Sequence, residues 1–222
     1  RRRDALRYLK GQTATDNQRD KVVAATAPLL SDFHLRGDAK AVLGVWATAD
    51  QADTLIATAN AAHGRKDRDT QRIAIELLAG TGSAKAASAV GTYFGTRHDV
   101  RAAGKALEAI GPSAVGHVLP YFNDSDHRTR QTARGLLTKW EVEEGTLAAQ
   151  SLDDLQSGDD NRAREAAQWF TSHVIVDEEL SPKVSAALVA LLANQNVRSD
   201  ATAALKFWAT SNTVPALTAA AA

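Results

Sequence analysis

The chain has 222 residues, 44% of them hydrophobic and 23% charged, with 26 basic and 26 acidic side chains and therefore a formal net charge of zero. This composition is typical of a globular protein, and a balanced charge gives no general attraction to nucleic acid or to an anionic membrane. Cysteine is absent, which excludes disulfides, thiolate metal sites and cysteine nucleophiles.

The chain starts with three arginines, and methionine is absent. We therefore expect this sequence to be a segment of a longer protein. Two explanations of the Arg1–Arg3 start remain open: the basic flank of a membrane segment removed upstream, or a solvated helix end. No apolar run approaches the roughly 18 residues that a membrane helix requires, which predicts a soluble domain of undetermined location.

A twelve-residue phrase recurs along the chain as "LRGDAKAVLGVW" (35–46), "TRQTARGLLTKW" (129–140) and "VRSDATAALKFW" (197–208). From its arginine as position zero, apolar or small residues follow at plus 3, plus 7 and plus 10, which is the spacing of one buried helix face. Weaker copies give zero positions at 2, 36, 68, 100, 130, 164 and 198, so each unit is 30 to 34 residues long.

A second apolar helix precedes each phrase, at 22–32, 52–62, 84–95, 114–124, 147–158 and 183–195. A short polar turn separates the two helices, so the repeating unit is a pair of helices. Pro28 and Pro120 recur at matched places before bulky pairs, which predicts a bend in the first helix.

The phrases "TAPLLSDFHLRGDAKAVLGVW" (26–46) and "LPYFNDSDHRTRQTARGLLTKW" (119–140) resemble HEAT repeats, particularly those of the phycobilisome-lyase type. The joint "DVRAAGKALEAIGPSAVGHVLPYF" (99–122) is similar to the connection between such repeats. The resemblance implies an all-α, right-handed superhelix of the HEAT/armadillo kind, with about six helix pairs in a single domain over residues 1–222. Neither end resembles a polar capping repeat, which also favours a segment of a longer array.

We expect the recurring alanine, leucine and tryptophan to form the core. The recurring arginine begins a helix, where a cation is unfavourable. Aspartates and asparagines in the preceding turns predict a ladder in which each arginine reaches a carboxylate or carbonyl of a neighbour.

Catalytic and metal sites are not expected. His34, His98 and His127 fall in equivalent turns, but turns of successive repeats lie about 10 Å apart, too far to share one ion. No nucleophile elbow, phosphate-binding loop or dinucleotide fingerprint occurs, and no cofactor is expected.

The plus 4 and plus 5 positions of the second helices point away from the first helices and predict a partner-binding surface on the concave face. These positions give basic residues followed by polar and aromatic ones: Arg7, Lys40, Arg72, Lys105, Arg134, Gln168, Trp169 and Thr202. Lys206 and Phe207 lie further round the same surface and complete the candidates. The alternative is a solvated face in which Arg72 pairs with Glu76 and Lys105 pairs with Glu108, both within one helix.

The sequence therefore favours a non-enzymatic scaffold that binds a protein or peptide. The alternative is a HEAT-like DNA-binding protein or DNA glycosylase, with nucleic acid as the partner. A bilin lyase is a further enzyme alternative that depends on the repeat type alone.

Overall fold

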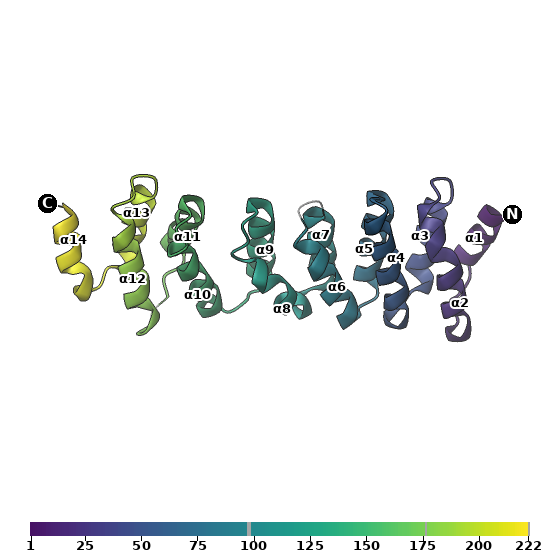
Figure 1. Ribbon diagram of the computed structural model, residues 1–222. Helices are drawn as coiled ribbons and strands as arrows, with labels where there is room; N and C mark the ends of the chain where they lie inside the picture. The colour runs from purple at the N-terminus through teal and green to yellow at the C-terminus, as the bar shows by residue number, and fades with distance from the viewer. Residues whose placement is uncertain (97–98, 176, 222) are drawn as a thin grey trace. The chain divides into compact units, whose positions relative to one another are not determined.

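The protein is described by a computed structural model, which covers residues 1–96, 99–175 and 177–221. It is all-helical, and no strand occurs among these residues (Figure 1). Its contacts divide the chain into two compact units, Arg1–Trp140 and Glu141–Ala222. Each unit has its own buried core.

The first unit contains nine α-helices within its described residues: α1 (Arg2–Lys10), α2 (Asp16–Thr26), α3 (Arg36–Trp46), α4 (Ala52–Gly64), α5 (Arg68–Gly80), α6 (Ala84–Phe94), α7 (Val100–Ile110), α8 (Val115–Val118) and α9 (His127–Lys139). Each even-numbered helix packs against the odd-numbered helix that follows it. The odd-numbered helices, here called the second helices, also pack on one another in the order α1, α3, α5, α7 and α9.

The second unit contains α10 (Glu144–Leu155), α11 (Asp160–Ser172), α12 (Leu180–Leu191), α13 (Arg198–Trp208) and α14 (Val214–Ala221). Helix α10 packs against α11 and α12, and α13 packs against both α11 and α12. Phe170, Leu188 and Trp208 are among the buried residues of its core. The arrangement is again that of helix pairs.

The predicted zero positions coincide with the starts of most second helices. Arg2, Arg36, Arg68, Val100 and Arg198 are each the first residue of their helix. The exceptions are α9 and α11, which begin about one turn before the recurring arginine. In both, an aspartate side chain at the N-cap, Asp126 or Asp159, accepts hydrogen bonds from backbone N–H groups and fixes the earlier start.

The two recurring prolines lie where the first helices change from α to 3₁₀ geometry. Pro28 lies in a 3₁₀ segment, Ala27–Ser31, that continues α2, and Pro120 lies in a second one, Leu119–Tyr121, that continues α8. Proline cannot donate the hydrogen bond that continues an α-helix, and its ring clashes with the preceding turn. The tighter 3₁₀ turn accommodates this change before each polar turn.

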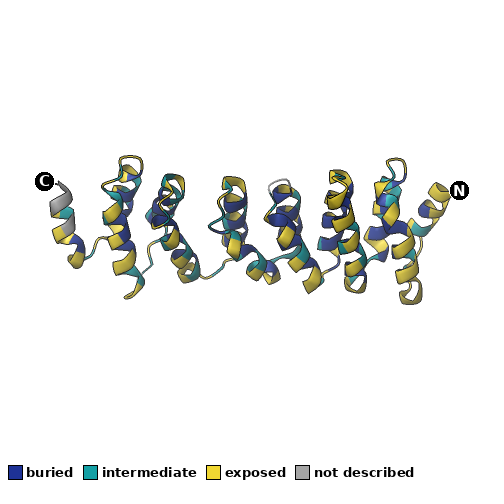
Figure 2. Ribbon diagram, in the orientation of Figure 1, coloured by how far each residue is buried: buried dark blue, intermediate teal, exposed yellow. Residues whose placement is uncertain are grey.

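The buried face also follows the prediction. The plus 3 and plus 7 residues of the three strongest phrases are buried, namely Ala39, Leu43, Ala133, Leu137, Ala201 and Leu205. In Figure 2 the buried residues of each helix pair lie mainly on the sides that face neighbouring helices. Small alanines allow the helix axes to approach, and each buried leucine contributes about 1.5–3 kcal/mol.

The plus 10 tryptophans differ from one another. Trp46 and Trp208 are 1% and 3% exposed, and their indole N–H groups donate to the carbonyls of Leu9 and Phe170 near the end of the preceding second helix. Trp140 is only half-buried, and its indole N–H donates to no described residue, contrary to the expected core role. It lies one residue beyond the end of α9, whereas the other two are the last residues of their helices.

A membrane-spanning helix was sought within the described ranges, and none of the helices there has the necessary length and apolar character.

Candidate functional site

The recurring arginine connects the two helices of its own pair. Arg36 Nε donates to the carbonyl of Leu30 (2.8 Å), and Arg198 Nε donates to that of Leu192 (2.7 Å). Arg130 makes the same contact six residues back, to Asp124 (2.6 Å). These carbonyls lie at the end of the first helix, where unpaired acceptors carry partial negative charge. The arginine side chain thus binds a backbone carbonyl that follows the first helix, while the residue itself lies near the start of the second helix.

Contacts of the expected ladder between neighbouring pairs include those of Arg36 and Arg164. Arg36 Nη1 lies 2.8 Å from Asp69 Oδ2 on α5, and Arg164 Nη2 donates to the carbonyl of Asn196 (3.1 Å).

Two of the predicted binding residues are neutralised by acidic partners. Lys40 Nζ on α3 lies 2.5 Å from Glu76 Oε2 on α5, and Arg72 Nη2 lies 3.6 Å from Asp69 Oδ1. Glu76 thus pairs across two helices and not with Arg72 on its own helix, as the alternative interpretation expected. Exposed pairs of this kind contribute about 0–1 kcal/mol, but they remove the surplus positive charge from this stretch.

Arg134 lies in a different environment from the predicted outward surface. Its Nε donates to the carbonyl of Phe122 (3.2 Å), and its guanidinium lies 4.8 Å from the centre of the Phe122 ring. An aromatic face and an unpaired helix-end carbonyl both attract a guanidinium. The side chain is half-buried, and these contacts hold it against the segment that precedes α9.

The two predicted aromatic residues belong to the second unit. Trp169 is half-buried and stacks on His173, with ring centres 4.3 Å apart and planes at 4°. It also meets the edge of Phe170, so it is part of the core boundary. Phe207 is 55% exposed on α13. No described contact brings Phe207 and Trp169 together.

Three of the predicted residues line hollows: Thr202 and Lys206 line one of about 510 Å³ on α13, and Lys105 lines another. The hollow at Lys105 is a groove of about 600 Å³ between α7 and α9, here called the α7/α9 groove. Arg101, Arg128 and Lys139 also line it, and Gly104 and Gly135 form part of its floor. The groove therefore brings four cations from two neighbouring second helices to one hollow.

The α7/α9 groove carries surplus positive charge. Glu108 is the one carboxylate among its described lining residues, and it binds Lys139 Nζ at 2.6 Å. The hydrogen bond and charge of Lys139 lower the pKa of Glu108, and Lys105 lowers it further, so this carboxylate stays ionised. Arg101, Lys105 and Arg128 pair with no carboxylate of the described residues. Three cations thus remain available to a ligand.

Glycines shape the floor of the α7/α9 groove in two ways. A Cβ at Gly104 would lie 2.8 Å from Thr132 Cγ2, so this glycine permits the close approach of α7 to α9. A Cβ at Gly135 would meet nothing within 4 Å, so the space above it is open. The glycines thus bring the helices together at one point and leave room beside it.

Sequence reasoning identified Lys105 but missed the rest of the groove. The signal was present as helical spacing: 101, 104, 105 and 108 share one face of α7, and 128, 132, 135 and 139 share one face of α9. The predicted surface depends mainly on the plus 4 and plus 5 positions of each second helix, and Arg101, Glu108, Arg128 and Lys139 lie outside them.

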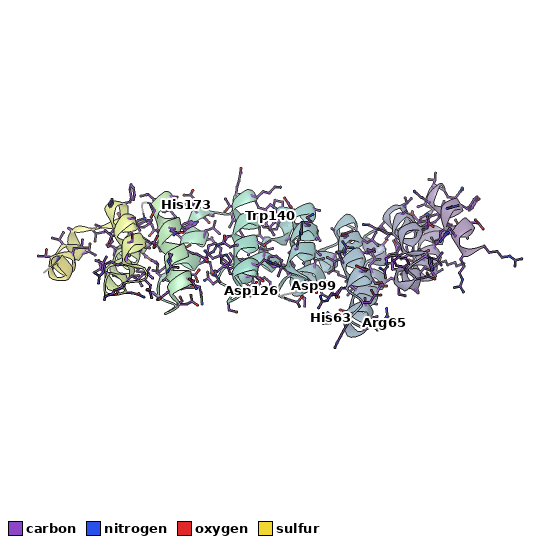
Figure 3. The ribbon with its side chains drawn as sticks, turned by 90° about the horizontal axis from the view of Figure 1, so that it is seen from above. His63, Arg65, Asp99, Asp126, Trp140 and His173 are labelled. Atoms are coloured by element: carbon purple, nitrogen blue, oxygen red, sulfur yellow. The ribbon has the colours of Figure 1, made fainter. Side chains whose placement is uncertain are left out.

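A second polar cavity, of about 550 Å³, lies near the turns of α4 and α5. Gln71 Nε2 donates to Asp99 Oδ2 (2.8 Å) and lies 3.2 Å from His63 Nδ1, and Thr96 Oγ1 also donates to Asp99 Oδ2 (2.9 Å). Figure 3 shows His63, Asp99 and Asp126 along one edge of the first unit, with Trp140 at the opposite edge. The polar side chains that line this cavity hydrogen-bond to one another, and these bonds connect three helices.

The histidines of the turns do not form a cluster. His34 lies in the turn before α3 and His127 begins α9, while His98 lies outside the described residues. Across the described part of the chain, no three side chains of His, Cys, Asp or Glu are placed to hold a metal ion.

Comparison with known proteins adds no assignment: no family model, no curated protein and no solved structure matches the chain.

Proposed function

We propose that this chain is a HEAT-like helical-repeat module, a right-handed solenoid of helix pairs, that binds a protein partner on the surface of its second helices without catalysing a reaction. The regular 30–34-residue spacing and the packing of α1, α3, α5, α7 and α9 in sequence support this fold. A row of helices held by core packing offers a rigid, extended surface, which suits a scaffold.

The α7/α9 groove is the observation that carries the proposal. Most polar side chains on the second helices serve the fold: Lys40 and Arg72 bind acidic neighbours, and Arg36 satisfies a helix end. Arg101, Lys105 and Arg128 are different, because they line a hollow and bind no carboxylate of the described chain. A partner that supplies this counter-charge would be attracted and oriented there.

Nucleic acid is the second candidate partner, since phosphates also bind clustered arginine and lysine. Protein is favoured because Lys40 on α3 and Arg72 on α5 already bind acidic side chains, which interrupts the continuous basic stripe that a phosphate backbone requires.

An unbiased peptide selection tests the proposal. A random peptide library is displayed on phage and selected against the full chain, and binding of the enriched peptides is then measured with the Arg101→Glu/Lys105→Glu variant. We expect enriched peptides to lose binding to this variant. The matched control, Lys21→Glu/Lys183→Glu, changes the charge equally on exposed first-helix positions and should retain binding. If no peptide is enriched, or if both variants bind equally, the second-helix surface is not the binding site.

A further inference from the structure

We propose that the α7/α9 groove recognises an acidic peptide segment in a defined direction, with its carboxylates at the N-terminal ends of α7 and α9 and one apolar side chain toward the Glu108–Lys139 pair. This inference rests on the proposed function and names the chemistry of the partner.

The charge of the groove changes along its length. Arg101 and Arg128 are each the second residue of their helix, so they lie in the first turns of α7 and α9. Backbone N–H groups of these first turns also point toward that end and carry partial positive charge. Lys105 lies one turn further along, about 6 Å at 1.5 Å per residue. Asp99 and Asp126 are the N-cap residues of these two helices, so the surplus positive charge at this end comes from the three cations, which favour anions there.

The opposite end of the groove is close to neutral. Glu108 and Lys139 bind each other there at 2.6 Å, and the pKa of Glu108 is lowered by the hydrogen bond and charge of Lys139, so the carboxylate keeps its charge. A ligand carboxylate beside Glu108 would be repelled, because like charges at close range are unfavourable. The anionic groups of the ligand are therefore confined to the N-terminal end.

The floor suits an apolar side chain. Leu136 contributes aliphatic atoms to the lining beside Gly135, above which the space is open. A ligand side chain of leucine size placed there would cover exposed backbone and aliphatic surface, which favours binding through the removal of apolar area from water. The ligand that fits the groove is therefore an acidic peptide segment. Its carboxylates bind the arginines, and one apolar side chain occupies the space above Gly135.

A phosphate backbone fits this charge distribution less well. Its charges are evenly spaced, so a strand that lies along the groove would bring one phosphate beside Glu108. An acidic peptide can place neutral or apolar residues at that point. Glu108, the one carboxylate among the described lining residues, therefore makes the groove favour an acidic peptide over a nucleic-acid strand.

The experiment uses the three most enriched peptides of the unbiased selection, synthesised with fluorescein and titrated with the full chain by fluorescence polarisation. We expect at least two carboxylates and one aliphatic or aromatic residue in each peptide. Replacing the carboxylates by amides, or the apolar residue by glycine, should weaken binding about tenfold or more, the equivalent of about 1.4 kcal/mol. Raising the salt from about 50 to 500 mM should weaken binding by screening.

The position of the peptide is tested with Gly135→Gln, which fills the open space without changing the charge. We expect about a tenfold loss of affinity. Gly37→Gln on α3 is the control, because a Cβ there also meets nothing within 4 Å, and it should bind as the parent chain does. Both replacements favour the helix, since glycine is a poor helix former, so a folding defect is not expected.

Peptides that need Arg101 and Lys105 but lack carboxylates or the apolar residue would overturn this inference and leave the proposed function standing. Equal affinity of Gly135→Gln and Gly37→Gln would also overturn it. A fluorescein-labelled 12-nucleotide single strand that binds more tightly than the peptides, and loses affinity with Arg101→Glu/Lys105→Glu, would replace the peptide by nucleic acid.

Discussion

Replacement of Trp208 by phenylalanine tests how successive second helices are joined. Trp208 Nε1 donates to the carbonyl of Phe170 (2.8 Å), which is near the end of α11, and the two rings meet edge to face with centres 5.0 Å apart. Carbonyls of a last helical turn have no partner within the helix. The tryptophan therefore satisfies a buried acceptor and packs against the ring of the same residue.

The magnitude follows from two losses. Leaving a buried acceptor unpaired costs about 1–3 kcal/mol. The smaller ring also leaves a cavity of a few tens of Å³, which costs about 1 kcal/mol at roughly 24 cal/mol per Å³. Trp208→Phe should thus lower the free energy of unfolding by about 2–4 kcal/mol. The matched Trp140→Phe change should cost little, since Trp140 is half-buried and its indole N–H donates to no described residue.

Urea unfolding followed by far-ultraviolet circular dichroism measures this difference, because that signal does not depend on tryptophan fluorescence. The comparison is made from the midpoints of the transitions at a common m-value. Equal shifts for Trp208→Phe and Trp140→Phe would refute the reasoning, because then neither the hydrogen bond nor the burial distinguishes the two positions.

Three further predictions concern packing, a buried ion pair and acid stability. Gly91→Ala should destabilise the first unit by about 1–3 kcal/mol in urea unfolding, because the new Cβ would lie 2.9 Å from the Cβ of His117; an unchanged midpoint would contradict this close approach. Arg162→Met should lower the free energy of unfolding by about 3 kcal/mol in the same assay, because it removes the guanidinium whose Nη2 lies 2.6 Å from Oδ1 of the fully buried Asp154. An unchanged free energy of unfolding would show that the Asp154 carboxylate is satisfied without this cation. Partial burial raises the pKa of Asp67, but hydrogen bonds from Thr70 and nearby arginines outweigh this, so its folded-state pKa lies below the ordinary value of 3.8. As the pH falls, Asp67 is therefore protonated in the unfolded chain before it is protonated in the folded chain, so the stability that it contributes is lost below about pH 4. In thermal unfolding from pH 6 to 3, the Asp67→Asn variant should lose less stability than the parent chain. Parallel plots of melting temperature against pH would contradict this.

The helices were predictable because their signals are local. The spacing from Arg36 to Trp46, and from Arg198 to Trp208, gave helices whose bounds the structure reproduces. Pro28 and Pro120 lie where the α-helical hydrogen bonding gives way to 3₁₀ segments, for an equally local reason, the missing N–H of proline. Each of these features depends on residues within about three helical turns.

The partners of long side chains were not predictable from spacing. Lys40 and Glu76 are 36 residues apart, and their pairing depends on how α3 lies against α5. Arg134 was expected on the outer surface, but Phe122 offers both an aromatic ring and a carbonyl within its reach. The four cations of the α7/α9 groove come from two helices, so only their packing shows that they line one hollow.

The most direct test of the central claim is to map the bound peptide by nuclear magnetic resonance. The most enriched peptide is added to the labelled full chain, and changes in backbone amide shifts are recorded along the sequence. The account predicts that the largest changes fall in Arg101–Glu108 and Arg128–Lys139, the two walls of the α7/α9 groove. Largest changes on the first helices, or in the second unit, would contradict it.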